Sequence, residues 1–293
     1  MKKLSVLFAS AGKISLFLLF PLFMSSQKDT VISGFSSPES VISDGKFIYV
    51  SNLGLKPQPT VKDTDGYISK LSLKGEIIKL KFIAGLNAPK GMAVSGNKLY
   101  VTDIDAVKGF DLKTGKEVFN LSFEKEKLNF LNDLCNKDEK HLFVSATDVS
   151  KIFEIDLAAK KYSELIATDS LLNPNGLYYD SKIKALYVAT MNKKGRLYSV
   201  VLGERKNMRV TIFSEVGLYD GLWMAGKDFF VSDWGFDGKG KIKLFNSFEM
   251  KFSTPDLKGK NSFSGPADFY YNEKTKKFWI PEMLTGNLHI ISY

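Results

Sequence analysis

The chain has 293 residues, of which 44% are hydrophobic and 25% charged, with a formal net charge of +9. This length allows one large domain or two small ones with a sizeable core, and the composition is that of a soluble globular protein. The single cysteine, Cys135, excludes an internal disulfide and a cysteine metal cluster, and two histidines are too few for a zinc site or a Ser-His-Asp triad.

The positive charge does not indicate a nucleic-acid-binding protein. The lysines are scattered singly, as on a solvated surface, and no basic stripe with interleaved aromatic residues is present. Nucleic-acid binding is therefore disfavoured.

The first 26 residues differ in pattern from the rest of the chain. Two lysines follow the N-terminal Met, an apolar run covers Ile14–Met24, and a polar segment follows it. This layout predicts a secretory signal peptide, and hence export to the periplasm or the extracellular space. Lys13 interrupts the longer apolar stretch and residues 24–26 are a weak cleavage signal, so an uncleaved N-terminal anchor is the alternative. We expect no other membrane association.

A repeat fills the remainder of the chain. Six segments, each with an apolar strand, a turn and a second strand, begin at Pro38, Pro89, Leu131, Pro174, Tyr219 and Pro266. Their starts are 51, 42, 43, 45 and 47 residues apart, as the differences between these numbers show. This is the period of four-stranded propeller blades, so we predict an all-β, six-bladed β-propeller over residues 29–293. A β-sandwich would not explain the even spacing.

The two ends of the repeat array complement each other. The last repeat stops after its third strand, at Tyr293, whereas residues 29–35 precede the first repeat and have no blade of their own. We therefore predict that this N-terminal segment supplies the missing outer strand of the last blade and closes the ring.

The residue after each repeat start is expected to point into the mouth of the central channel. In chain order these residues are Glu39, Lys90, Asn132, Asn175, Asp220 and Ala267. Two carboxylates and two amides converge from four blades, and such oxygen ligands suit one divalent cation, such as calcium, magnesium, manganese or zinc. The alternative is that Pro, Asn, Asp and Gly are simply what blade-joining turns use.

These motifs resemble those of the gluconolactonase, senescence marker protein and luciferin-regenerating enzyme family of six-bladed propellers. Glu39 in PES, Asn132 in LND, Asn175 in PNG and Asp220 in YDG match the family's motifs residue by residue. The resemblance implies that these four residues bind the cation, that Asp220 is the general base on the water that attacks a lactone, and that Asn132 also contacts substrate.

Two positions depart from the family pattern. Phe130 stands where the family often has an arginine for substrate oxygens, and Lys90 occupies a slot beside the proposed cation. An ammonium there repels a cation at short range. Lys90 either binds a substrate carboxylate or replaces the metal by pairing with Glu39 and Asp220.

Further candidates lie at the ends of the second strands, on the same face. Asp103 and Asp233 are expected to bind substrate from this rim, and Trp234 either stacks on a ligand or packs between blades. The longest loop, 53–65, contains prolines and no periodic pattern, so we expect it to lie over the mouth unless it is only a solvated connection.

Two functions remain open at this level. The first is an exported, metal-dependent hydrolase of a lactone or related cyclic ester. The second is a non-enzymatic propeller that binds a small ligand or a protein partner. The fold alone does not choose between them.

Overall fold

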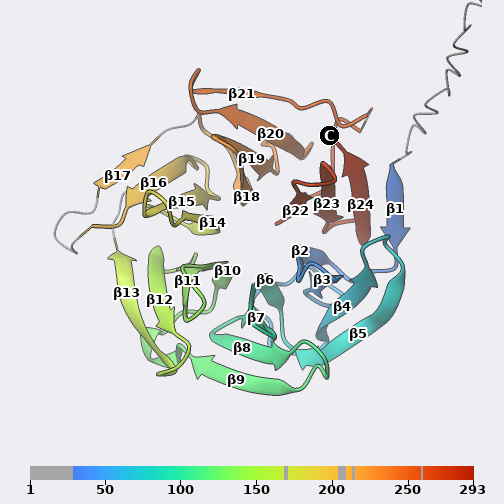
Figure 1. Cartoon of the computed structure of the whole chain (residues 1–293), viewed down its shortest axis with the longest axis vertical. Coiled ribbons are helices and arrows are strands. Elements are labelled where there is room, and N and C mark those ends of the chain that lie inside the picture. Colours follow the sequence, from blue (N-terminus) through green and yellow to red (C-terminus); the bar gives the residue numbers. More distant parts are fainter. Residues whose placement is uncertain (1–28, 168–170, 204–208, 213–214, 259) are drawn as a thin grey trace, which may run out of the picture.

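The computed structural model describes residues 29–293 except 168–170, 204–208, 213–214 and 259, and the predicted signal peptide, 1–26, lies outside the described residues. The described residues form six four-stranded antiparallel sheets arranged as the blades of a ring (Figure 1). The predicted six-bladed β-propeller is therefore confirmed. No helix in this described part is long and apolar enough to cross a membrane.

The strands fall into four concentric sets. The innermost are β2 (Pro38–Ser43), β6 (Pro89–Ser95), β10 (Leu131–Asn136), β14 (Pro174–Asp180), β18 (Tyr219–Ala225) and β22 (Tyr270–Asn272). The second set is β3 (Phe47–Asn52), β7 (Lys98–Asp103), β11 (His141–Ala146), β15 (Ala185–Thr190), β19 (Asp228–Asp233) and β23 (Lys277–Glu282). The third is β4 (Gly66–Ser72), β8 (Ala106–Asp111), β12 (Lys151–Asp156), β16 (Leu197–Val201), β20 (Lys241–Asn246) and β24 (Asn287–Ser292). The outer set is β5 (Ile77–Leu86), β9 (Glu117–Ser122), β13 (Lys161–Ala167), β17 (Arg209–Ile212), β21 (Lys251–Ser253) and β1 (Thr30–Ser33), and a 3₁₀ turn, η1 (Glu124–Glu126), follows β9.

The hydrophobic core lies between successive blades. One cluster joins Tyr100 and Phe119 of the second blade to Leu142 and Phe153 of the third, and comparable clusters fill the other junctions. The strands are rich in β-branched and aromatic residues because each sheet is covered on both faces by its neighbours.

The ring closes as predicted. Strand β1 pairs with β24 in an antiparallel register that sets Ile32 opposite Leu288 and Ser33 opposite Asn287. The Ser33 hydroxyl donates a hydrogen bond of 2.7 Å to Asn287 Oδ1. The first strand of the described residues thus completes the last blade, which removes the open edge of β24.

The inner strands share an irregularity that shapes the channel. In the first five blades the pairing with the second strand shifts between the first and fourth residues, as between Pro174 and Leu177. Bulges of this kind re-aim side chains. Gly176 sits in one, and a Cβ there would lie 2.1 Å from the backbone oxygen of Asp220, so the glycine allows adjacent inner strands to approach.

Candidate functional site

One mouth of the channel contains a cavity of about 310 Å³. It brings together six of the predicted site residues, namely Glu39, Lys90, Asn132, Asn175, Asp220 and Trp234. The first five occupy the second position of their inner strands, and each is at least 95% buried. The repeat register thus brings five of the six expected ring residues to one cavity, whereas Ala267 does not line it.

Hydroxyl side chains on the second strands hold the bulges in place. Ser51 and Ser232 accept hydrogen bonds from the backbone N–H groups of Ser40 and Gly221, at 2.9 and 2.7 Å. Ser145 Oγ donates to the backbone oxygen of Asn175, in the next blade, at 2.8 Å. Buried backbone groups that the irregular pairing frees are thus satisfied, and the ring residues sit on a fixed support.

Asp220 has a hydrogen-bond partner at one carboxylate oxygen and none at the other. The Trp234 indole N–H donates to Asp220 Oδ2 at 2.8 Å, whereas Oδ1 is buried without a hydrogen-bond partner. Burial, followed by repulsion from Asp268, raises the pKa of Asp220 to about 7, against the lowering effect of Trp234 and Asn175. A carboxyl with a pKa near neutrality is suited to general acid–base chemistry.

Glu39 provides a second open oxygen. Its Oε2 atom is buried without a hydrogen-bond partner. Burial, reinforced by the charges of Asp220 and Asp268, raises the pKa of Glu39 well above its usual value, and Lys90 opposes this rise. Buried carboxylate oxygens without partners are costly unless a proton or a cation compensates them.

Lys90 does not pair directly with either carboxylate. Its Nζ donates to the backbone oxygen of Ala88 at 3.0 Å and lies 4.9 Å from the centre of the Phe130 ring. Burial lowers the pKa of Lys90 to about 8, and the charge of Glu39 is the largest opposing influence. The alternative in which the ammonium replaces the metal by ion pairing with Glu39 and Asp220 is therefore not seen in this geometry.

The residues fit a hard divalent cation. The Asn132 amide nitrogen donates to Thr147 Oγ1 at 3.1 Å and that of Asn175 to Met191 Sδ at 3.6 Å, which leaves their carbonyl oxygens for other contacts. Within the described residues no group of three His, Cys, Asp or Glu side chains has metal-binding spacing. A cation at this cavity would take the two carboxylates, Glu39 and Asp220, and the two amide oxygens.

The predicted rim residues Asp103 and Asp233 do not line this cavity. Asp103 accepts from the backbone N–H groups of Asn87 and Ala88 and pairs with Lys108 at 2.7 Å. Asp233 likewise accepts from the Leu218 N–H at 3.0 Å and pairs with Lys243 at 2.6 Å. Both carboxylates anchor the chain that enters their own inner strand, and we leave them out of the proposed site.

The walls of the cavity are apolar. They consist of Leu53, Pro57, Pro59, Phe130, Met191, Trp234, Met283 and Leu284. Three of these belong to the loop 53–65, so the expected position of that loop at the mouth is confirmed. Sequence reasoning missed Met191, Met283 and Leu284, which lie just after second strands and are ordinary apolar residues in type.

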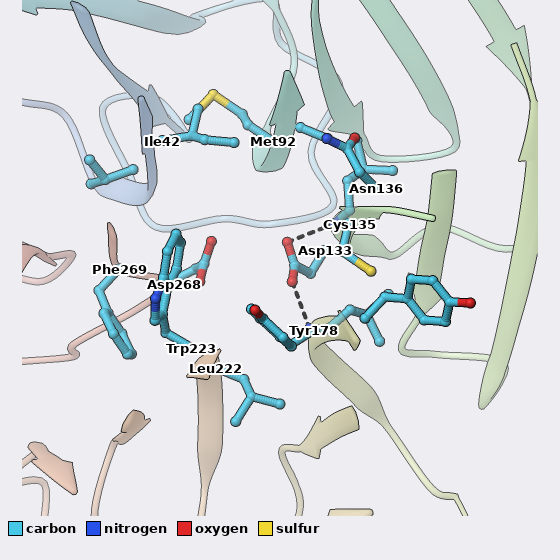
Figure 2. Close-up of a pocket in the computed structure, with 15 residues that line it drawn as sticks. Ile42, Met92, Asp133, Cys135, Asn136, Tyr178, Leu222, Trp223, Asp268 and Phe269 are labelled. Carbon is cyan, nitrogen blue, oxygen red and sulfur yellow. Dashed lines mark hydrogen bonds between the residues drawn. The ribbon is translucent and has the colours of Figure 1, made fainter. Parts of the chain in front are cut away.

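A second cavity, of about 260 Å³, lies further along the channel and is lined by later residues of the inner strands. Figure 2 shows Asp133 and Asp268 pointing into it from facing sides. Asp133 accepts from the N–H groups of Leu134 and Leu177, both at 2.7 Å, and Asp268 Oδ2 accepts from Ser40 Oγ at 2.6 Å. Burial, then repulsion between the two groups, raises the pKa of Asp133 well above its usual value, and burial raises that of Asp268 to about 7.

Cys135 lines the same second cavity. Burial, followed by the charge of Asp133, raises the pKa of its thiol well above the usual value. A thiol of this kind is not an activated nucleophile, in agreement with the packing role that the sequence favoured.

Comparison with known proteins gives structural matches alone. No family model matches the chain, and no curated protein matches it. Similar solved structures include a protein of unknown function from Bacteroides thetaiotaomicron (12% identity, TM-score 0.68, covering 90% of this chain and 76% of that one). An auxiliary nutrient binding protein from Bacteroides ovatus has 12% identity and a TM-score of 0.67 over 88% of this chain and 69% of that one. A luciferin-regenerating enzyme has 13% identity and a TM-score of 0.63 over 91% of this chain and 96% of that one.

At these identities the likeness shows a shared propeller fold. The luciferin-regenerating enzyme belongs to the family whose motifs the sequence resembles, and its fold agrees with that resemblance. The fold is compatible with several functions, and the side chains of the site distinguish them.

Proposed function

We propose that this propeller is an exported, divalent-metal-dependent hydrolase of a lactone or related cyclic ester. One observation carries the proposal: the carboxylates of Glu39 and Asp220, from two different blades, each leave one buried oxygen without a partner at a common cavity. The signal-like pattern of the first 26 residues supports export.

A calcium, magnesium, manganese or zinc ion is the proposed cofactor. Glu39, Asn132, Asn175 and Asp220 would hold it, and such a cation polarises a carbonyl oxygen and stabilises the negative charge that develops on it. The orphaned oxygens and the adjoining amides support this choice, because a hard cation satisfies several oxygen ligands at once.

Asp220 is the proposed general base. Its Oδ2 accepts the hydrogen bond of Trp234, whereas Oδ1 is buried without a partner and would take the proton of the water that attacks the lactone carbonyl. The carboxyl would then return this proton to the ring oxygen as the ring opens. The pKa of about 7 applies to the site without a cation; a bound cation would lower the pKa of Asp220 and keep the carboxylate ionised as a base at neutral pH.

The second candidate is a non-enzymatic propeller that binds a small molecule. Two observations favour it: the buried Lys90 beside the carboxylates, which opposes a cation, and the apolar walls of the cavity. The name of the similar Bacteroides ovatus protein, an auxiliary nutrient binding protein, is consistent with such a role.

Hydrolysis of a lactone panel distinguishes the two functions. We expect turnover with added calcium or manganese, loss of turnover in EDTA, and loss of at least about a hundredfold in kcat for Asp220→Asn, which is the low end for a general base. Asp237→Asn, an exposed carboxylate of the hairpin that follows Trp234, is the matched control and should retain activity. Turnover that persists in EDTA or in Asp220→Asn would contradict the proposal.

A further inference from the structure

The polar and apolar groups of the mouth cavity are strictly separated. Of the thirteen described residues that line it, the five polar ones are all second-position residues of inner strands, at the floor. The other eight are apolar and form the walls. We infer that the substrate is a lactone with an aliphatic or aromatic substituent, and not a polyhydroxylated sugar lactone. This inference rests on the proposed function and specifies its substrate class.

The walls are built into the fold. Leu53 is 2% exposed and belongs to a small cluster with Ala88 and Ile104, against which Met283 packs. The loop 53–65 that carries the prolines is tied at its far end, because Lys62 pairs with Asp105 at 2.6 Å. Two separate elements, this loop and the turn after β23, therefore present an apolar surface over the polar floor.

A sugar lactone would be poorly accommodated by these walls. With Glu39, Asp220 and the two asparagines occupied by the cation and the lactone group, the hydroxyls of a sugar would face carbon atoms. A buried hydroxyl without a partner costs about 1–3 kcal/mol. Asp103 and Asp233 were the carboxylates that the sequence predicted at the rim. They already accept hydrogen bonds from backbone N–H groups and pair with lysines.

Phe130 strengthens the expected preference for an apolar substituent. Its ring lines the cavity and lies 4.9 Å from the Lys90 Nζ. The Lys90 ammonium group thus contacts the Phe130 ring and donates a hydrogen bond to the Ala88 carbonyl. The aromatic ring of Phe130 therefore adds apolar surface beside the polar floor.

Calorimetric binding of γ-lactams tests the substrate class without hydrolysis. Lactams with unbranched alkyl substituents of increasing length are titrated into the full protein with calcium present, and a polyhydroxylated lactam is compared with them. Burial of one methylene is worth about 0.8 kcal/mol. We therefore expect the Kd to fall about fourfold per added methylene until the cavity of about 310 Å³ is filled.

Two exposed leucines provide a variant and its control. Leu284, a wall residue, is 58% exposed and Leu55, in the loop but not in the walls, is 83% exposed, so both substitutions to serine should leave the fold intact. Leu284→Ser should reduce the gain per methylene, and Leu55→Ser should not. A Kd independent of chain length, no binding of any alkyl lactam, or tighter binding of the polyhydroxylated lactam would overturn the inference. If the lactam series behaves as expected but no lactone is hydrolysed, the ligand class stands and the hydrolase proposal fails.

Discussion

Trp234 donates its indole N–H to Asp220 Oδ2 at 2.8 Å, and Oδ1 of the same carboxylate is buried without a partner. Asp220 comes from the start of β18 and Trp234 directly follows β19, the adjacent strand of the same blade. The tryptophan is therefore a positioning residue for the carboxylate. The proposed chemistry depends on this difference between the two oxygens of Asp220: Oδ2 has a hydrogen-bond partner and Oδ1 has none.

Trp234→Phe should move the acid limb of the pH–rate profile upward. The indole hydrogen bond lowers the pKa of Asp220, so its removal raises that pKa and the base becomes ionised only at higher pH. A hydrogen bond to a charged group is worth about 1.5–3 kcal/mol, which corresponds to a shift of about one to two pH units. We expect kcat/KM to fall near neutral pH and to recover in alkaline buffer. An unshifted profile with uniformly lower activity would indicate that Trp234 only shapes the cavity.

Lys90→Met should strengthen divalent-cation binding. Lys90 is 1% exposed and its charge acts on Glu39, so its removal eliminates repulsion at a proposed ligand without opening the cavity to water. At an effective dielectric constant near 20, removing such a charge corresponds to about tenfold or more in the Kd for calcium. Calcium titration of the two proteins at about pH 7, below the pKa of about 8 of Lys90, so that its ammonium is charged, measures this effect. Weaker binding in the variant would show that the ammonium instead holds Glu39 in its binding position.

The stability of the fold should decline as pH rises through neutrality. The pKa of Asp268 is raised to about 7 in the folded chain from an unfolded value of 3.8. A group with a raised folded pKa contributes stability that is complete below the unfolded value and is lost as pH rises through the folded value. Each unit of pKa difference is worth about 1.4 kcal/mol. Chemical denaturation of the metal-free protein between about pH 4 and pH 8 should show this fall, and Asp268→Asn should make it shallower. An equal slope in Asp268→Asn would contradict the assignment, whereas the exposed Glu249→Gln should match the parent.

Ring closure by β1 should be sensitive to one face of that strand. Ile32 packs against the core cluster of Trp279, Leu288 and Ile290, whereas its neighbour Val31 is 49% exposed on the other face. Burial of an apolar side chain is worth about 1.5–3 kcal/mol, so Ile32→Asp should lower the free energy of unfolding by at least that amount. Val31→Asp, one residue away, should change it by less than about 0.5 kcal/mol. Similar losses in both variants would mean that packing of β1 contributes little to closure.

The repeat made the fold and the polar floor predictable. The six repeats begin at a near-constant spacing, which places Glu39, Asn132, Asn175 and Asp220 at equivalent positions of their blades. A side-chain direction inferred for one blade therefore applies to the others. The same register also explains the missing outer strand that β1 supplies.

The parts that escaped prediction lie where periodicity gives no information. Asp103 and Asp233 are carboxylates at the expected rim positions and were therefore predicted to bind substrate. In the folded chain they instead accept hydrogen bonds from backbone N–H groups, whose direction the sequence does not give. Met283 and Leu284 lie in a connection after β23, and Asp268 lines the channel from the segment that precedes β22. Side-chain direction at a bulge and the path of a connection are tertiary properties.

The most direct test of the central claim is the thermal stability of the protein with and without calcium or manganese. A cation that binds the native state at a hundred times its Kd stabilises it by about 2.7 kcal/mol, which corresponds to a rise in Tm on the order of 5–10 °C for a chain of this size. We expect this rise in the parent protein and in Asp237→Ala, and none in Asn175→Ala or Asp220→Ala. No rise with any divalent cation, or an undiminished rise in Asp220→Ala, would contradict a metal site at the channel mouth.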